Sequence, residues 1–260
     1  MRLLKRQHDG EFVPYEFNDE STPPYAILSH TWFGDHEEVT FQDIKHSTGR
    51  SKRGWKKITF CAEKAISDGL EYFWIDTCCI NQKSSSELSE ALNSMFRWYR
   101  NSRHCYVYLS DVSFKNPNDL QQTLEADFRQ SRWFTRGWTL QELLAPSSVK
   151  FFSEEANLIG DKKTLVQPIH EITRIPVTAL SGTPLAEFTT GTRMKWASNR
   201  QTKRAEDKAY CLFGILNVHM CPIYGEGGEE AWDRLKEVVE KKKREVMEKE
   251  KKDYAGKQVL

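Results

Sequence analysis

The chemistry that this sequence suggests rests first on four residues: Glu142, Asp76, Ser29 and Trp138. Trp138 and Glu142 are four residues apart in a stretch expected to be helical, so both side chains can line one wall of a site. An aromatic wall excludes water, which strengthens the electrostatic effect of a carboxylate beside it. Such a carboxylate can stabilise positive charge that develops on a sugar, orient the sugar hydroxyls or activate water.

The other candidates suit a ligand that carries hydroxyl groups, phosphate or an aromatic base. Asp76 can accept two hydrogen bonds from ribose hydroxyls, and Ser29 can bond a phosphate or a ribose. Trp32 can stack on a base, while Asn81 and Gln82 can line the rim. Each residue type also has a plain structural role as the alternative: a surface glutamate, a core tryptophan, a capping serine or a turn-forming aspartate.

Other catalytic arrangements have less support. A Cys79–His30 pair would provide a thiol and its base, but the sequence shows no geometry for it. No Gly-x-Ser-x-Gly elbow, dinucleotide fingerprint or Walker loop is present. The six cysteines include no Cys-x-x-Cys pair, so we expect reduced thiols and no metal site.

Composition excludes several classes of partner. The 38 basic and 37 acidic residues give a net charge of +1, so electrostatics make no case for nucleic-acid or membrane binding. The basic N-terminus lacks the apolar segment of a signal peptide, and no apolar run is long enough to span a bilayer. We therefore expect a cytoplasmic protein.

Strands and helices alternate along the first part of the chain. Apolar runs predict strands at 25–29, 70–75, 105–109 and 149–152. Helices are expected at 53–68, from the capping box of Ser84 and Glu87 onward, and at 135–145. This rhythm predicts an α/β fold of flavodoxin type, with flanking helices on a mainly parallel central sheet. Ligands bind such sheets outside the carboxyl ends of the strands, where Ser29 and Asp76 fall.

The remaining segments predict fewer strands. Residues 1–24 are polar, and residues 113–130 form an aperiodic excursion. Residues 157–240 are expected to be mainly helical. Helices are expected to begin at Asp161 and at Thr183-Pro184, and two further helices are expected at 207–216 and 229–239. We thus predict one domain over 1–240, with a core at about 25–153, a helical extension at about 157–240 and a charged tail at 241–260.

Three sequence blocks resemble the fungal HET (heterokaryon incompatibility) domain family. They are Tyr25–Trp32 (YAILSHTW), Phe73–Gln82 (FWIDTCCINQ) and Arg136–Leu143 (RGWTLQEL). The opening MRLL and the late runs 204–214 and 224–227 are also similar, so the resemblance spans about residues 1–238. It implies a cell-death signalling module in incompatibility, with a receptor-type incompatibility protein as a possible partner.

A more distant similarity is to TIR domains. These also place a serine after the first strand, an acidic residue after the second, and Trp-x-x-x-Glu on a later helix, here Trp138 to Glu142. The similarity implies a TIR-like core, NAD as substrate without a prosthetic group, Glu142 as the catalytic residue and a site completed by self-association. Two other functions stay open: a non-enzymatic module that assembles with its own kind, and a sensor that binds a nucleotide without cleaving it.

Overall fold

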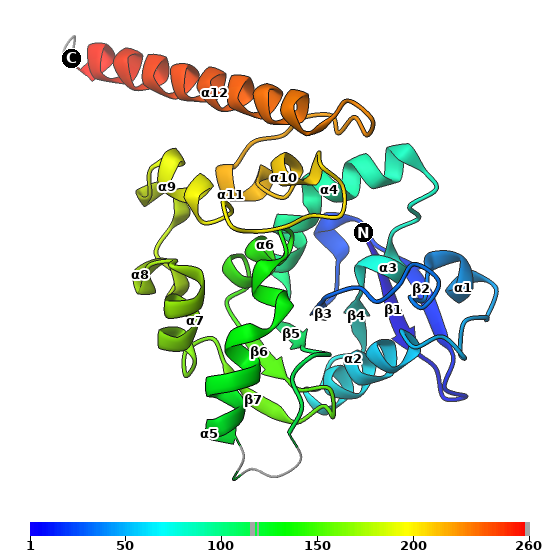
Figure 1. Ribbon diagram of the computed structural model, residues 1–260. Coiled ribbons are helices and arrows are strands. Elements are labelled where there is room, and N and C mark those ends of the chain that lie inside the picture. The colour runs from blue at the N-terminus through cyan, green and yellow to red at the C-terminus, as the bar shows by residue number, and fades with distance from the viewer. Residues whose placement is uncertain (115–117, 119, 258–260) are drawn as a thin grey trace.

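The central feature is a seven-stranded sheet in the computed structural model, which describes residues 1–114, 118 and 120–257. The strand order is β2-β1-β4-β3-β5-β6-β7 (Figure 1). The strands are β1 (Arg2–Arg6), β2 (Phe12–Glu16), β3 (Tyr25–His30), β4 (Tyr72–Trp74), β5 (His104–Tyr108), β6 (Val149–Phe152) and β7 (Leu158–Asp161). The four central strands are parallel, whereas β1, β2 and β7 pair antiparallel. The sheet is therefore mixed, and the mainly parallel prediction holds only for its centre.

The three outer strands were missed for local reasons. β1 is short and rich in basic residues, and β2 is a short edge strand that carries Pro14 and exposes Val13 and Tyr15. Asp161 ends β7 instead of beginning a helix directly. Its carboxylate accepts hydrogen bonds from the backbone N–H groups of Lys163 (2.9 Å) and Thr164 (2.8 Å), which forms the turn into α7 (Val166–Thr173).

Helices cover both faces of the sheet because side chains alternate along each strand. On one face, Phe60 of α2 (Trp55–Ser67) packs against Tyr106 and Tyr108 of β5. On the other, Trp74 of β4 packs against Trp98 and Tyr99 of α4 (Ser85–Asn101). The expected helices at 53–68 and after Ser84 are thus confirmed. The resulting α/β layers place His30 on the α2 side of β3 and Ser29 on the α4 side.

The helix expected at 135–145 is shorter in the structure. A 3-10 turn, η4 (Arg132–Thr135), comes first, and Arg136 is then extended. Helix α6 (Thr139–Leu144) begins only after Trp138, which occupies its N-cap position. The break lets η4 and α6 approach the sheet from two directions, and both carry residues of the site described below.

The rest of the chain forms short helices and one long one. They are η1 (Asp19–Ser21), α1 (Phe41–Lys45), α3 (Asp76–Cys79), α5 (Leu120–Thr123), the π-helical η3 (Leu124–Phe128), α8 (Val177–Leu180), η5 (Leu185–Glu187), α9 (Thr190–Lys195), α10 (Asp207–Tyr210), α11 (Phe213–Leu216) and α12 (Gly228–Lys257). The expected excursion at 113–130 thus contains helical turns, although residues 115–117 and 119 lie outside the described part. Thr183-Pro184 is expected to supply the N-cap and first residue of a helix, but Pro184 is the N-cap of η5, which begins one residue later than expected. The helix expected at 207–216 is split into α10 and α11.

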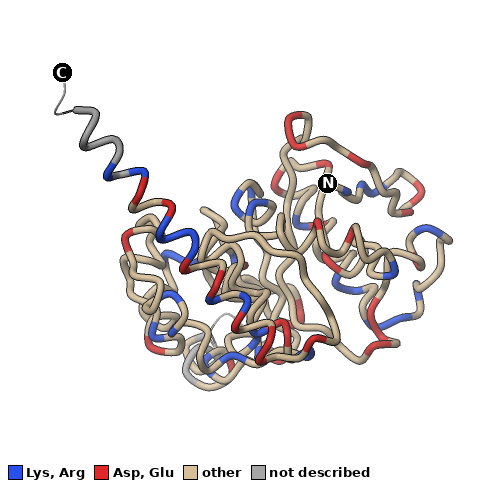
Figure 2. Tube along the Cα trace, turned by 90° about the horizontal axis from the view of Figure 1, so that it is seen from above, with Lys and Arg blue, Asp and Glu red and all other residues tan. Residues whose placement is uncertain are grey.

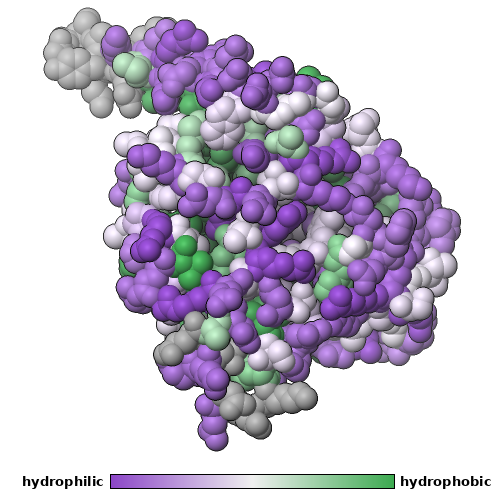
Figure 3. Space-filling view, viewed as in Figure 1, coloured by the Kyte–Doolittle hydropathy of each residue, from purple (hydrophilic) through white to green (hydrophobic). Residues whose placement is uncertain are grey.

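The first turns of helix α12 pack on the body of the molecule through Ala231, Leu235 and Val239, and the helix then extends beyond it (Figures 1 and 2). Basic and acidic residues alternate along its described length, which agrees with a solvated charged helix (Figure 2). The tail expected at 241–260 is therefore helical to Lys257, and residues 258–260 lie outside the described part. The face shown in Figure 3 is mostly hydrophilic, with separate apolar spots. No helix in the described ranges is long and apolar enough to cross a bilayer.

Candidate active site at the carboxyl edge of the sheet

Ser29 and Glu142 meet in a buried chain of hydrogen bonds. Ser29 lies near the end of β3, and Glu142 projects from α6. The indole Nε1 of Trp133 in η4 donates to Ser29 Oγ at 2.8 Å, and the Ser29 hydroxyl donates to Glu142 Oε2. Because an indole N–H can only donate, the chain has one direction, from Trp133 through Ser29 to Glu142.

Burial makes the Glu142 carboxyl a weak acid. The residue is 6% exposed, and loss of water is the main reason that its pKa rises to about 8. The negative charge of Asp76 also raises this pKa, whereas the hydrogen bond from Ser29 and the positive charge of Arg200 lower it. At neutral pH the carboxyl is therefore mostly protonated, and the groups around it decide how readily it ionises.

Asp76 is a second carboxyl at the same edge, directly after β4. It begins α3 and accepts hydrogen bonds from Trp32 Nε1 and from the Thr77 backbone N–H, both at 2.8 Å. Burial raises its pKa to about 6, although the bond from Trp32 opposes this. Its side chain is still 22% exposed, and Trp32 is 38% exposed. Asp76 and Trp32 are therefore the part of this cluster that solvent reaches.

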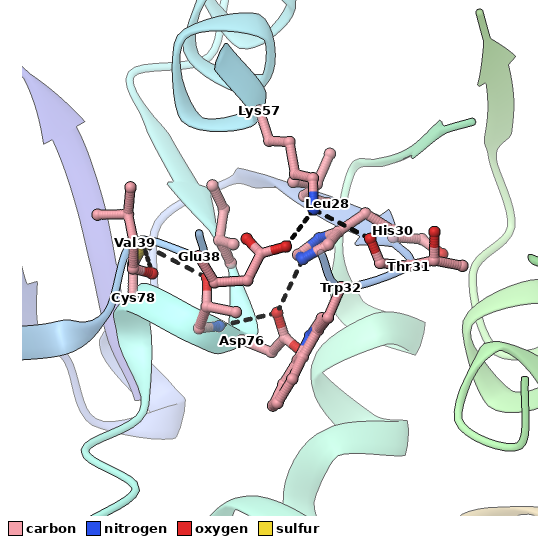
Figure 4. A network of polar contacts seen from close by, with 12 residues as sticks. Leu28, His30, Thr31, Trp32, Glu38, Val39, Lys57, Asp76 and Cys78 are labelled. Carbon is pink, nitrogen blue, oxygen red and sulfur yellow. Dashed lines mark hydrogen bonds and ion pairs between the residues drawn. The ribbon is translucent and has the colours of Figure 1, made fainter. Parts of the chain in front are cut away.

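A buried ion pair supports the loop that carries Trp32. Lys57 of α2 is 1% exposed, and its ammonium group donates to the Thr31 carbonyl at 3.0 Å and to the Glu38 carboxylate (Figure 4). Glu38 also accepts from the Phe33 backbone N–H at 2.6 Å. Desolvation lowers the pKa of Lys57 to about 8 despite this partner. The pair fixes the loop from Thr31 to Glu38 against α2.

His30 lies between the ion pair and Asp76 (Figure 4). Its Nε2 is 3.7 Å from Asp76 Oδ1, and this buried nitrogen has no hydrogen-bond partner within the described residues. Burial holds the pKa of His30 well below its usual range, and the nearby Lys57 charge acts in the same direction. The imidazole is therefore neutral, and the contact is not an ion pair.

Comparisons with known proteins place the chain in a family. The model of the family described as heterokaryon incompatibility protein (HET) matches residues 25–121. The vegetative incompatibility protein HET-E-1 of Podospora anserina is 52% identical over 243 residues, which are 93% of this chain. The chain belongs to the HET family. It spans only 18% of the length of HET-E-1, and no solved structure matches this HET domain.

Trp138 and Gln82 lie apart from the carboxyl cluster in this HET domain. The half-buried Trp138 indole packs against the hydrophobic core and lies close to Asp207 of α10, and it has no hydrogen bond to Glu142 among the described residues. Gln82 is exposed on the turn after α3. The structure thus joins Ser29, Trp32, Asp76 and Glu142 at one edge, while ligand contacts for all seven candidate residues stay predictions.

The structure gives no support to a cysteine nucleophile. Cys79 Sγ accepts a hydrogen bond from the Ile75 backbone N–H at 3.4 Å, and burial raises the pKa of this thiol to about 12. Such a thiol is almost entirely protonated at neutral pH and is a poor nucleophile. Among the described residues, no group of His, Cys, Asp and Glu side chains could hold a metal ion.

Four residues of the site were missed by the sequence analysis: Glu38, Lys57, Trp133 and Arg200. Lys57 left a signal, because it is a charged residue beside the apolar positions of an amphipathic helix. Trp133 precedes the third family block by only a few residues. Glu38 and Arg200 stand in loops, where no periodicity marks a buried residue.

A cavity lies at the opposite edge of the sheet. It has a volume of about 550 Å³ and is lined by residues at the amino ends of the strands, including Tyr25, Arg97, His104 and Ser148. It contains none of the predicted site residues. The carboxyl edge is singled out by its chemistry and not by its volume.

Proposed function

We propose that this HET domain acts in fungal incompatibility signalling by hydrolysing NAD at the bond between nicotinamide and ribose. The observation that carries the proposal is the placement of Glu142 beside Ser29 at the carboxyl edge, with the Asp76 carboxyl at the same edge. This edge is where parallel α/β sheets bind their ligands. The proposal also rests on the distant similarity to TIR domains, and on the name of HET-E-1, a vegetative incompatibility protein.

The reaction needs one carboxylate and water. The bond between ribose C1′ and the nicotinamide nitrogen breaks, and its electron pair leaves with nicotinamide, which becomes neutral. Ionised Glu142 stabilises the positive charge left on the ribose. Water then forms the new C1′–O bond and releases its proton, giving ADP-ribose. The Trp133–Ser29 chain holds the carboxylate in place, and Asp76 binds ribose hydroxyls beside it, with Trp32 against a base.

Self-association is part of this proposal. Glu142 is only 6% exposed, so a single copy offers the substrate little access to the carboxylate. A contact between copies, or with a receptor-type incompatibility protein, would have to open this edge. The enzyme is therefore expected to be nearly inactive as a monomer and active when concentrated or tethered into oligomers.

The direct test is nicotinamide release from NAD by tethered protein. Glu142→Gln keeps the size and the hydrogen bond from Ser29 but removes the charge, so release should fall at least ~100-fold. Glu171→Gln is the matched control, because Glu171 is an exposed glutamate on α7 that bonds Arg129 and Gln167. It should behave like the parent chain. No release by the parent chain in any assembled form would refute the enzymatic proposal.

The same burial of Glu142 favours a second function, a non-enzymatic module that signals by homotypic assembly. Overexpression in fungal cells separates the two. If Glu142→Gln still kills cells as the parent chain does, catalysis is not the effector. Calorimetry with NAD and with ADP-ribose then tests the third possibility, a domain that binds a nucleotide without cleaving it.

A further inference from the structure

Arg200 is a buried arginine in the loop between α9 and α10. It is 7% exposed, and its Nη1 donates to the Arg136 carbonyl at 2.7 Å and to Thr139 Oγ1 at 2.8 Å. Its Nε donates to the Trp196 carbonyl at 3.4 Å. All three acceptors are uncharged, so the guanidinium is held inside the protein without a carboxylate in direct contact. Burying a charge in this way lowers the stability of the fold, which indicates that Arg200 has a functional role.

The acceptors of Arg200 belong to the junction that carries the site. Arg136 directly follows η4, which provides Trp133, and Thr139 is the first residue of α6, which provides Glu142. Thr139 Oγ1 also donates to the Trp133 carbonyl at 2.6 Å. The neighbour of Arg200 fixes the same junction: Gln201 bonds Gly137 and Thr135 through the backbone at 2.9 and 2.6 Å.

The charge of Arg200 acts on Glu142. It lowers the pKa of Glu142, and the Glu142 charge in turn raises that of Arg200, which burial has brought down to about 10. Among the other ionisable neighbours of Glu142, the charge of Asp76 from α3 raises its pKa, whereas the hydroxyl of Tyr99 from α4 lowers it. The thiol of Cys105 from β5 is a further neighbour. Arg200 is thus the cation that opposes the charge of Asp76. Its Nη2 is buried and has no hydrogen-bond partner in the described part of the chain, so this nitrogen could donate a further hydrogen bond.

We propose that Arg200 is a positioning residue for Glu142: it fixes the junction before α6 and provides the positive charge that allows the buried carboxyl to ionise. The proposal deepens the NAD hydrolysis proposed above and rests on it for its effect on activity. The electrostatic part stands without any enzyme activity. Arg200 lies in the helical extension at about 157–240, so the proposal also gives this extension a part in the site. The extension lies outside the residues 25–121 that the family model matches.

The test compares Arg200→Gln, Arg200→Lys and Arg193→Gln in the full chain. Arg193 is the matched control: it lies in α9, bonds one backbone carbonyl (Ile215, 2.7 Å) and also has a buried Nε without a partner, but its charge is not among those that act on Glu142. The pKa of Glu142 is measured by carbon NMR of the labelled carboxyl, with Glu142→Gln to assign the signal. Nicotinamide release is measured against pH on tethered protein.

Arg200→Gln should raise the pKa of Glu142 by at least ~1 unit, since a nearby opposite charge shifts a carboxyl by that much. Arg200→Lys, which keeps a charge but loses the second nitrogen, should raise it less, and Arg193→Gln should leave it in place. Activity at pH 7 should fall ~10-fold per unit and recover at higher pH, which a merely structural role would not produce.

An unchanged Glu142 pKa in folded Arg200→Gln overturns the proposal, whatever the activity. If that variant does not fold, Arg200→Lys decides: no rise relative to Arg193→Gln overturns the proposal as well. A shifted pKa in a chain that never cleaves NAD supports the positioning role and refutes only the proposed reaction.

Discussion

The two edges of the parallel strands bury their polar groups differently. At the carboxyl edge, Glu142, Lys57 and Glu38 are each less than a tenth exposed and lie in direct contact with other polar groups. At the amino edge, Arg97 and Asp19 form an ion pair beside an open cavity, with side chains 47% and 56% exposed. Buried ionisable groups therefore mark the carboxyl edge, whereas solvent-exposed charges beside a cavity mark the amino edge.

The comparison shows which edge of the sheet carries groups whose burial lowers the stability of the fold. Burying an ionisable group without full compensation destabilises a fold, so a cluster of such groups indicates selection for something other than stability. A water-filled cavity with exposed ion pairs costs little. The following predictions use unfolding experiments to break or sharpen this contrast.

The largest effect is expected when the buried ion pair is broken. Glu38→Gln leaves the Lys57 ammonium, which is 1% exposed, without its carboxylate partner. We expect a loss of about 3–5 kcal/mol in the free energy of unfolding at pH 7, measured by urea denaturation. Asp19→Asn, which breaks the exposed Arg97 pair, should cost at most ~1 kcal/mol. Equal losses at the two positions would remove the contrast between the edges.

A pH-dependent effect of intermediate size is expected at Glu142. Its pKa is raised to about 8 in the folded chain from a usual value of 4.5, so the folded state holds the proton more tightly. Stability is then lost as pH rises from about 4.5 toward 8, and Glu142→Gln removes this loss. The variant should be more stable than the parent chain by on the order of 3 kcal/mol at pH 7, with little difference at pH 4.

Neutralising Asp68 at the amino edge is expected to change the stability at pH 7 in the opposite direction. Burial opposes the shift, but hydrogen bonds from Lys150 and Tyr106 hold the pKa of Asp68 below its usual range. Its ionised form therefore contributes stability above that range, and Asp68→Asn should destabilise the chain at pH 7. Glu142→Gln and Asp68→Asn shifting stability in the same direction at pH 7 would contradict the electrostatic account of both edges.

The sequence could predict the elements that packing alone specifies. The four central strands are apolar runs buried on both faces, and the helices between them have one apolar face, so local patterns suffice. β2 and β7 are short strands that pair only with their sequence neighbours β1 and β6, and β1 also pairs with the distant β4. Strands of four or five residues with charged residues or proline give too weak a local pattern to reveal these pairings. The sequence also predicts that Ser29 and Asp76 lie at one edge, because the carboxyl ends of parallel strands meet at the same edge of a sheet. The motif order places Glu142 on a helix near that edge.

The finer geometry of the site was beyond sequence reasoning. A helix expected to begin at Thr135 begins at Thr139, and this break turns Trp138 toward Asp207 while Trp133 reaches Ser29. Arg200 produces no recognisable pattern in its loop, because its two Nη1 contacts are with Arg136 and Thr139, more than 60 residues away. Such contacts depend on the folded chain, not on residue spacing.

The smallest effect in this series tests the chain of donors at the carboxyl edge. Ser29→Ala removes the acceptor of Trp133 Nε1 and the donor to Glu142, and Ser29 is fully buried, so water cannot replace the hydroxyl. An unsatisfied buried donor costs about 1–3 kcal/mol. Ser148→Ala at the amino edge removes a 2.9 Å contact with His104 Nδ1, but there the cavity supplies water, so the loss should stay below ~1 kcal/mol. Urea denaturation at pH 7 measures both. A loss at Ser148 as large as that at Ser29 would show that the hydroxyl at the carboxyl edge is not held more tightly than one exposed to the cavity, and Glu142 would lose the partner that fixes its position.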